Sequence, residues 1–419
     1  MKSTETRAIT LRHNRKAPDK VSVIPSKSEL HRLLIASALS DSETVILCGR
    51  DMLSKDIEAT SKCLSELGAK ISFEGELIRV TPISDLPKEC LLDCYESGST
   101  LRFMLPVVAA LGVNATFTGR GRLPERPLDD LLCVMKEHGI SFSSEKLPLT
   151  VSGKLSPGLF SISGGVSSQY ITGLLFALSL LSGDSTVSLT SPLESAGYVK
   201  ITLDVLKSFG VCVSEGSEGS YSVSGGARFT SPREIRASGD WSNASYFLAS
   251  GALFAPIRVS NLDLLSSQGD MKILDILADF GADIEINEGD VTVSPNIRRP
   301  LTVDLQQIPD LLPTLAALAV FADGESVFTG GKRLRIKESD RISSVANMIN
   351  SLGGEALELP EGLIVRGKRP IGGVIDSAND HRIAMASALI SLGCESDVTL
   401  TGADAVSKSY PTFFEEFGI

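Results

Sequence analysis

Cations stand where the sequence predicts the first turns of two buried helices. Lys27 precedes the apolar run 33–39, and Arg382 leads into the apolar run 384–392. A cation opposes the positive end of a helix dipole, so each of these side chains needs an anionic partner. Free N–H groups at a helix start also attract anions, and a ligand phosphate or carboxylate would satisfy both. The pattern therefore predicts a small anionic ligand.

The densest charged segment of the chain, 337–341, has Glu338 among its cations. Just before it, Leu334 and Ile336 alternate with basic residues, which favours an extended segment with the basic side chains on one face. Arginine can bind a carboxylate or phosphate through two hydrogen bonds, whereas lysine supplies a point charge. A carboxylate among cations resists protonation until a substrate changes the field, which suits Glu338 to acid–base catalysis. The alternative is a solvated loop that leads into a helix.

Other catalytic motifs are missing from the sequence. The pair 380–381, aspartate and histidine, could belong to a hydrolase triad, but no serine lies in a nucleophile elbow. There is no glycine-rich phosphate loop ending in Gly-Lys-Ser/Thr, and no set of ligand side chains with metal-site spacing. The arginine-rich loop 119–127 is either a mobile surface loop or a lid that adds a phosphate ligand. The sequence therefore offers no motif for a phosphate loop or a metal site.

Glycines at nearly constant spacing reveal the elements that must position these residues. Each closes an apolar segment with helical spacing, and glycine suits the left-handed conformation just past a helix end. The intervals between them are 71, 71, 71, 72 and 65 residues, which predicts six copies of one supersecondary block. The six are Gly68, Gly139, Gly210, Gly281, Gly353 and Gly418.

Each copy also contains a helix that is apolar on nearly every side, so we expect it to be buried beneath an outer layer of strands. These buried helices begin with small or polar residues, which are also the preferred helix caps. Equivalent helix starts in a pseudo-symmetric group point the same way, so two groups could enclose an anionic ligand. Counting back about twelve residues from each glycine places the other helix starts at Asp56, Arg126, Tyr198, Asp270, Arg341 and Lys408.

Composition excludes several classes of function. The 419 residues exceed one ordinary core, and 42% hydrophobic with 22% charged residues is typical of a soluble globular protein. The net charge of −11 argues against nucleic-acid and membrane-surface partners. No apolar run reaches the roughly 18 residues of a membrane span. The seven cysteines form no Cys-x-x-Cys pair, so we expect reduced thiols and a cytoplasmic location.

Nine short motifs occur in order along the chain. They are 25–28 with Arg32, 97–102, 125–127, 167–169, 239–242, 308–310, 337–341, 380–382 and Lys408. From about Val21 to Ile419 the sequence resembles the 3-phosphoshikimate 1-carboxyvinyltransferase family, also called 5-enolpyruvylshikimate-3-phosphate synthases. The resemblance implies an α/β fold of two domains, an inside-out α/β barrel of six βαβαββ repeats with three in each domain. It places 22–237 in the first domain and 1–21 with 238–419 in the second, with the active site in the cleft between them.

The resemblance also implies a reaction and its residues. The carboxyvinyl group of phosphoenolpyruvate passes to the 5-hydroxyl of shikimate 3-phosphate, phosphate leaves, and the enzyme acts as a monomer without cofactors. Asp310 orients or deprotonates the hydroxyl, while Glu338 and Lys27 move the proton to and from the methylene carbon. The implied shikimate 3-phosphate contacts are Lys27, Ser28, Arg32, Ser167, Ser168, Gln169, Ser195, Tyr198, Asp310 and Lys337. The implied phosphoenolpyruvate contacts are Lys27, Gly98, Arg126, Gln169, Arg341, Arg382 and Lys408.

The sequence departs from the family pattern at a few positions. Phe103 replaces a common proline, Arg333 aligns near an asparagine that contacts the shikimate phosphate, and the usual Asn-Ala-Gly-Thr stretch is altered at 96–99. One alternative function is the sister enzyme UDP-N-acetylglucosamine 1-carboxyvinyltransferase, whose lid loop typically carries a reactive cysteine. Here the loop has none, and Cys133 follows on a helix where we expect it in the core. The other alternative is a non-catalytic repeat scaffold that binds a partner protein.

Overall fold

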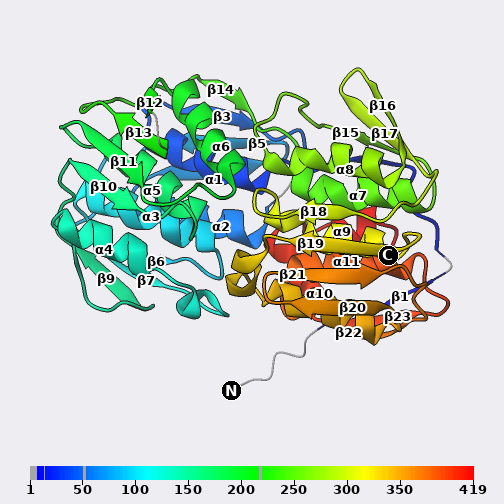
Figure 1. Cartoon of the computed structure of the whole chain (residues 1–419). Helices are drawn as coiled ribbons and strands as arrows, with labels where there is room; N and C mark the ends of the chain where they lie inside the picture. Colours follow the sequence, from blue (N-terminus) through cyan, green and yellow to red (C-terminus); the bar gives the residue numbers. More distant parts are fainter. Residues whose placement is uncertain (1–6, 14, 51–52, 217–218) are drawn as a thin grey trace. The chain divides into compact units, whose positions relative to one another are not determined.

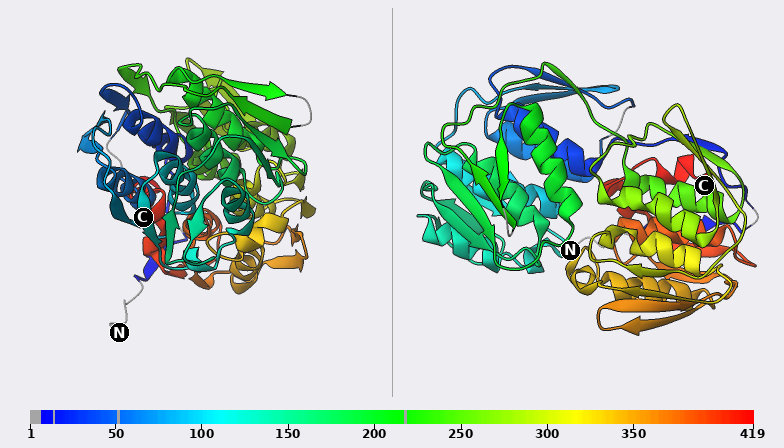
Figure 2. Two further views of the ribbon diagram at one scale, coloured as in Figure 1. Left: turned by 90° about the vertical axis from the view of Figure 1, so that its left-hand side faces the viewer. Right: turned by 45° about the horizontal axis from the view of Figure 1, so that its top comes forward.

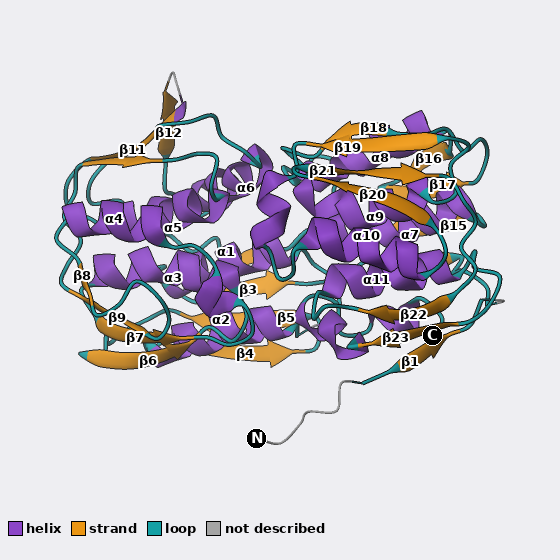
Figure 3. Cartoon of the chain, turned by 60° about the horizontal axis from the view of Figure 1, so that its bottom comes forward, coloured by secondary structure: helices purple, strands orange, loops and turns teal. Residues whose placement is uncertain are grey.

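The computed structural model describes residues 7–13, 15–50, 53–216 and 219–419. They form two compact units (Figure 1). The first unit is Pro25–Ser238, and the second unit combines residues up to Ile24 with Gly239–Ile419. Within each unit helices lie inside and strands outside (Figure 3), and two further directions show the same arrangement (Figure 2).

The chain passes between the two units at two places, and both lie close to the predicted domain borders. Val23 N donates to Ser260 O at 3.2 Å, and Asp240 N donates to Ile24 O at 2.9 Å. These bonds hold residues 22–24 in the second unit, so the first unit begins three residues later than the sequence predicts. It also ends one residue later, at 238 instead of 237.

Three sheets form the outer layer of the first unit. Their strands are β3 (Thr44–Leu47), β4 (Lys70–Glu74), β5 (Leu77–Thr81), β6 (Glu89–Asp93), β7 (Asn114–Thr118), β8 (Ser141–Phe142), β9 (Leu149–Ser152), β10 (Leu159–Ile162), β11 (Ser185–Leu189), β12 (Val213–Gly216), β13 (Ser220–Val223) and β14 (Glu234–Arg236). The sheet orders are β14-β3-β5-β4, β6-β7-β9-β8 and β10-β11-β13-β12. In each, the first pair is parallel and the other pairs are antiparallel. The same βαβαββ block therefore repeats three times, with β14 returning from the unit's end to complete the first block.

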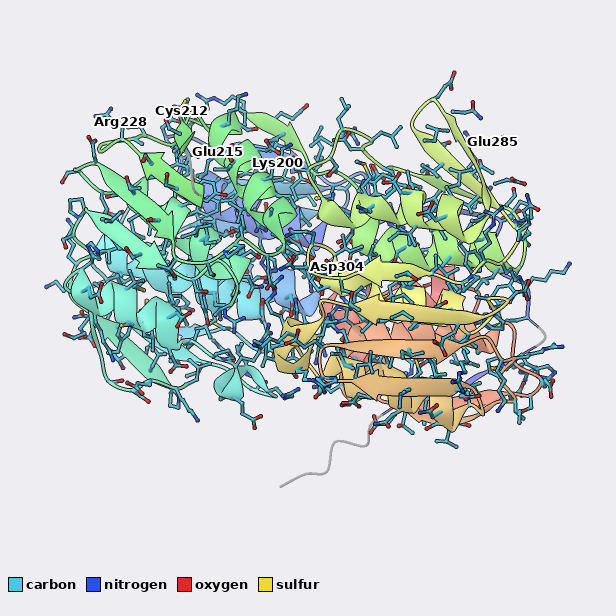
Figure 4. The ribbon with its side chains drawn as sticks, in the orientation of Figure 1. Lys200, Cys212, Glu215, Arg228, Glu285 and Asp304 are labelled. Atoms are coloured by element: carbon cyan, nitrogen blue, oxygen red, sulfur yellow. The ribbon has the colours of Figure 1, made fainter. Side chains whose placement is uncertain are left out.

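The second unit repeats this plan with one change. Its strands are β1 (Ile9–Leu11), β2 (Lys20–Ser22), β15 (Ile257–Ser260), β16 (Asp283–Asn287), β17 (Asp290–Ser294), β18 (Thr302–Asp304), β19 (Glu325–Thr329), β20 (Glu355–Leu359), β21 (Gly362–Arg366), β22 (Gly373–Asp376) and β23 (Val398–Thr401). Two sheets have the orders β16-β17-β15-β2 and β18-β19-β21-β20, and the third is β1-β23-β22. In that sheet the antiparallel partner of β23 is β1, from the other end of the chain. Exposed charges such as Glu215 and Glu285 lie on the strand layers of the two units (Figure 4).

The predicted buried helices are confirmed. Every residue of α7 (Trp241–Leu253) and α11 (His381–Ser391) is buried. Their counterparts are α1 (Lys27–Ala38), α3 (Gly98–Leu111), α5 (Ser168–Leu178) and α9 (Leu312–Ala319). A side-chain cap from Ser26, Ser97, Ser167, Asp240 or Asp380 starts five of these six helices, because apolar helices still leave their first N–H groups unpaired.

The predicted helix ends are confirmed, but three of the predicted starts are wrong. All six glycines have left-handed φ values between 77° and 107°. The helices they close are α2 (Lys55–Glu66), α4 (Asp129–Glu137), α6 (Ala196–Ser208), α8 (Ile273–Phe280), α10 (Arg341–Ser351) and α12 (Phe413–Glu416). Arg126, Asp270 and Lys408 lie before their helices, in or directly after 3-10 turns. Proline at 127 and 411 disfavours helical conformation in the preceding residue, which shortens α4 and α12.

The remaining findings concern the cysteines, possible membrane-spanning helices and possible metal sites. All seven cysteines are free thiols, and Cys133 is exposed on α4, so its expected place in the core is wrong. Over the ranges that the structure describes, no helix is long and apolar enough to cross a bilayer. In those same ranges, no three His, Cys, Asp or Glu side chains are grouped to hold a metal ion.

Candidate active site

The predicted site residues of the second unit surround Asp310, which lies in the 3-10 turn Pro309–Leu311 before α9. Arg341 Nη1 donates to Asp310 Oδ1 at 2.8 Å, and Arg382 Nη2 donates to Asp310 Oδ2 at 3.2 Å. Lys337 Nζ lies 3.4 Å from Asp310 Oδ1. In this structure, therefore, a protein carboxylate supplies the anion that Arg382 requires at the start of α11.

Arg341 at the start of α10 is 1% exposed and is bound to carboxylates on several sides. Its Nε donates to Asp380 Oδ2 at 2.9 Å, and its Nη2 donates to Glu338 Oε2 at 2.7 Å. Burial opposes the charge, but the carboxylates of Asp380, Glu338 and Asp310 outweigh it and raise the pKa of Arg341 above its ordinary value. The guanidinium is therefore permanently charged and fixed in direction.

Asp380 binds the guanidinium of Arg341 and the backbone N–H of Arg382 at once. It caps α11 by accepting from Arg382 N at 2.9 Å, and it also binds Arg341 through both carboxylate oxygens. Ser339 Oγ adds a hydrogen bond at 3.1 Å. The sequence assigned this residue no role, although a helix-capping carboxylate beside a predicted anion-binding arginine is a recognisable signal.

Lys337 and Lys408, the two predicted lysines of the second unit, have different surroundings. Burial lowers the pKa of Lys337, although the charge of Asp310 opposes that shift, so this ammonium group releases a proton more readily than an exposed lysine. Lys408 lies at the end of the turn Ala403–Lys408 and donates to Asn379 O at 2.7 Å. That bond brings it beside the residue that precedes Asp380.

The basic segment before Lys337 is not extended as the alternation predicts. Residues Lys332–Ile336 form a 3-10 turn that buries Leu334 and leaves Ile336 exposed. Arg335 points to structural partners, with Nη1 donating to Asp340 Oδ2 at 2.9 Å and to Glu358 Oε1 at 2.8 Å. Arg333 Nη2 makes a long contact of 3.4 Å to the carbonyl oxygen of Gln306.

Asp270 is a further carboxylate in this unit, 6% exposed. Burial, followed by the charge of Asp310, raises the pKa of Asp270 to about 6. Between its unfolded value near 3.8 and about 6, the folded protein binds more protons than the unfolded chain does. The neutral carboxyl thus contributes stability that is present at low pH and is lost as the pH rises through 6.

We expect Asp270→Asn to remove this pH dependence. Relative to wild type, the variant should gain unfolding free energy as the pH rises from 4.5 to 7, by about 2 kcal/mol. Urea unfolding followed by fluorescence of Trp241, the one tryptophan, measures this in the same unit. Asp275→Asn, an exposed carboxylate on α8, is the control. Parallel pH profiles for all three proteins would contradict the expectation.

Lys27 in the first unit is paired with a protein carboxylate. It is the first residue of α1, and its Nζ donates to Asp56 Oδ2 in the first turn of α2 at 2.8 Å. Both side chains retain slight exposure, 15% and 13%, so the pair is accessible to a competing anion. The sequence identified Asp56 only as a helix start. Lys27 also lies at a helix start, and this shared position is the signal that could have predicted their pairing.

Arg32 is buried at 2% exposure and bonds to neutral oxygens. Its Nε donates to Thr202 Oγ1 at 2.8 Å, its Nη2 donates to Tyr198 O at 3.0 Å, and its Nη1 donates to Ser28 O. Burial lowers the pKa of Arg32 to about 9. Since no carboxylate forms an ion pair with it in the described residues, an anionic ligand would stabilise its charge.

Gly98 lies where two arginine side chains meet. A Cβ at this first residue of α3 would lie 2.7 Å from Arg126 Nη1 and 2.8 Å from Arg102 Nη1. Arg102 Nη1 donates to Gln169 Oε1 at 2.8 Å, and Gln169 Nε2 donates to Ser99 Oγ at 2.9 Å. These hydrogen bonds connect α3 to the start of α5 through Arg102 and Gln169. In the sequence, Arg102 belongs to one of the nine motifs but has no predicted role.

The remaining predicted residues lie at the starts of α5 and α6. Ser167 caps α5 by accepting from Gln169 N at 3.3 Å, and Ser168 is the buried residue that follows. Ser195 precedes α6 with φ 54° and ψ 48°, a strained conformation for serine that often marks a functional site. Tyr198 N donates to Ser195 O at 3.1 Å. Each unit thus gathers its own predicted residues at helix starts.

Comparisons with known proteins identify relatives of this chain. A sequence model described as EPSP synthase (3-phosphoshikimate 1-carboxyvinyltransferase) matches residues 12–417. The 3-phosphoshikimate 1-carboxyvinyltransferase of Clostridium kluyveri is 42% identical over 406 residues, or 96% of this chain and 95% of the relative. That of Clostridium novyi is 39% identical over 410 residues, or 95% and 94%.

Solved structures share the fold. EPSP synthase from Acinetobacter baumannii gives a TM-score of 0.82 at 23% identity, covering 98% of this chain and 97% of that one. The enolpyruvyl transferase NikO from Streptomyces tendae gives 0.77 at 16% identity, covering 99% and 97%. Together with the sequence matches over nearly the full length, these findings show that the chain belongs to the EPSP synthase family.

Proposed function

We propose that this chain performs its family's reaction with the residues gathered in its two units. The reaction transfers the enolpyruvyl group of phosphoenolpyruvate to the 5-hydroxyl of shikimate 3-phosphate and releases phosphate, a step of the shikimate pathway. Both substrates carry phosphate and carboxylate groups, so they match the cations described above. In this proposal both sets of residues act on the same substrate pair, in a monomer of the cytoplasm.

Most of the shikimate 3-phosphate contacts proposed lie in the first unit. Arg32 supports this assignment most directly, because it is buried and forms no ion pair with a carboxylate in the described part of the chain, while Lys27 can exchange Asp56 for a ligand anion. The proposed contacts are Lys27, Ser28, Arg32, Ser167, Ser168, Gln169, Ser195 and Tyr198, with Asp310 and Lys337 from the second unit.

The phosphoenolpyruvate contacts proposed combine arginines from both units. Arg341 and Arg382 both hold Asp310 in this structure, and the carboxylate of phosphoenolpyruvate would take its place beside them. The proposed contacts are Lys27, Gly98, Arg126, Gln169, Arg341, Arg382 and Lys408.

The proposed chemistry is addition followed by elimination. Asp310, once released from the arginines, orients or deprotonates the 5-hydroxyl, whose oxygen bonds to the central carbon of phosphoenolpyruvate. A proton adds to the methylene carbon, and its later loss restores the double bond as phosphate leaves. Glu338 and Lys27 are the proposed carriers of that proton. The arginines stabilise the negative charge on phosphate throughout.

The observation that supports this function most strongly is that three cations, Arg341, Arg382 and Lys337, surround one carboxylate, that of Asp310. The direct test measures phosphate release with phosphoenolpyruvate, with shikimate 3-phosphate and with both together. We expect release only with both. Release from either alone, or no release at all, would refute the proposal. Absence of thermal stabilisation by saturating shikimate 3-phosphate would favour the repeat scaffold.

Gly98→Ala tests the proposed phosphoenolpyruvate contacts. The new Cβ would displace the flexible ends of Arg126 and Arg102, so the fold should persist with a stability change within about 1 kcal/mol. We expect the KM for phosphoenolpyruvate to rise roughly tenfold, because an arginine is moved, and the KM for shikimate 3-phosphate to change little. Steady-state kinetics with each substrate varied in turn decide this. An equal rise in both KM values would contradict the assignment.

A further inference from the structure

A line of buried polar side chains joins three helices of the first unit. His31 Nδ1 on α1 lies 2.7 Å from Thr60 Oγ1 on α2, which lies 2.7 Å from Thr100 Oγ1 on α3. Thr100 Oγ1 donates to Ser97 Oγ at 2.8 Å. All four residues are at most 1% exposed, so each of these polar groups depends on the next for its hydrogen bond.

The direction of every proton in this line follows from the cap of α3. Ser97 Oγ accepts from both Thr100 N and the Thr100 hydroxyl. Since that hydroxyl proton is used, the Thr100 oxygen accepts from Thr60, and the Thr60 oxygen accepts in turn from His31. His31 therefore carries a proton on Nδ1.

The surroundings keep this imidazole neutral. Burial, helped by the positive charges of Lys27 and Arg32, holds the pKa of His31 well below its ordinary value of 6.5. The other ring nitrogen, Nε2, is buried and has no hydrogen-bond partner in the described part of the chain. The histidine thus contributes one directed donor, with no role as an acid at neutral pH.

Both ends of the line adjoin proposed substrate contacts. On α1, His31 stands directly before Arg32 and one turn after Lys27. On α3, Ser97 directly precedes Gly98.

A second contact between the same two helices runs through Phe103 of α3. Its ring meets the His31 ring edge-on at 6.2 Å between centroids. Arg32 Cζ lies 4.9 Å from the centroid of the same ring. Phe103 therefore links α3 to both His31 and Arg32.

We propose that His31 is a positioning residue that fixes the start of α3 relative to α1. It acts through Thr60 and Thr100 on the cap of α3, and through Phe103 on the guanidinium of Arg32. The inference rests on the proposed function, since it concerns the alignment of Gly98 with Lys27 for phosphoenolpyruvate.

The test compares His31→Leu with His31→Asn. Leucine removes the donor, whereas the asparagine amide can place an N–H where Nδ1 stands. We expect kcat/KM for phosphoenolpyruvate to fall about tenfold in His31→Leu, mainly through KM, and to return within about threefold of wild type in His31→Asn. Thr44→Val is the matched control, because it removes a buried hydroxyl pair with Ser231 (2.8 Å) in the same unit.

The outcomes separate the two proposals. Kinetic constants of His31→Leu equal to those of Thr44→Val, with wild type active, would overturn the positioning role and leave the function intact. A wild-type protein without turnover would overturn the function itself. Nitrogen NMR supplies an independent readout: we expect a protonated Nδ1 and an unprotonated Nε2 on His31 at neutral pH. The opposite tautomer would also overturn the inference.

Discussion

Alanine in place of Asp310 is expected to lower turnover about 100-fold or more, with much smaller changes in both KM values. Asp310 is proposed to act while the 5-hydroxyl attacks, so its removal should destabilise the transition state and lower kcat. The same pattern is expected of Glu338→Ala, whose carboxylate is proposed to move a proton. Steady-state phosphate release, with each substrate varied in turn, separates kcat from KM.

Two further variants make this result decisive. Asp310→Asn keeps the shape of the side chain but cannot take a proton, so it should be as slow as Asp310→Ala. Glu285→Ala removes an exposed carboxylate from β16 and should retain wild-type turnover (Figure 4). Near-normal turnover in both Asp310 variants would rule out the proposed role.

Arg341→Met is expected to destabilise the second unit and abolish turnover. The substitution leaves the carboxylates of Asp310, Glu338 and Asp380 without the cation that binds all three. Breaking a buried ion pair costs about 3–5 kcal/mol, and Asp380 is fully buried here. Urea unfolding followed by the fluorescence of Trp241 measures the loss in the same unit.

A surface pair provides the matched control. Arg258 is 65% exposed and pairs with Asp290, so Arg258→Met should change the unfolding free energy by less than about 1 kcal/mol. Arg341→Lys keeps the charge but loses the planar fork, so it should fold and still turn over far more slowly than wild type. Equal stability losses at 341 and 258, or full activity in Arg341→Lys, would contradict this account.

The repeat is the part of the fold that sequence predicts best. Glycine is almost alone in tolerating the left-handed conformation beyond a helix, so Gly68 and its five equivalents mark helix ends directly. Helix starts are less constrained, because capping residues also suit turns. Arg126 and Lys408 were placed at helix starts by counting back about twelve residues from each glycine, although a proline follows each within three residues.

The sequence singles out candidate site residues but does not predict their pairings. Arg341 and Asp380 are 39 positions apart, and Arg32 and Thr172 are 140 apart. Such contacts depend on the packing of whole helices, which local sequence patterns do not encode. The alternation of basic and apolar residues over 333–337 led to a wrong prediction of an extended segment. The structure has a 3-10 turn there that buries Leu334.

The strand β1 has a consequence for how the protein is made. The register pairs Ile9 with Leu400, so β1 must wait until the ribosome has added the residues up to β23. At about 5–20 residues per second, this delay is roughly 20–80 s. The first unit is contiguous and can fold on the ribosome during that time. The second unit cannot complete its third sheet until β23 has been synthesised, so β1 needs protection from wrong partners in the interval.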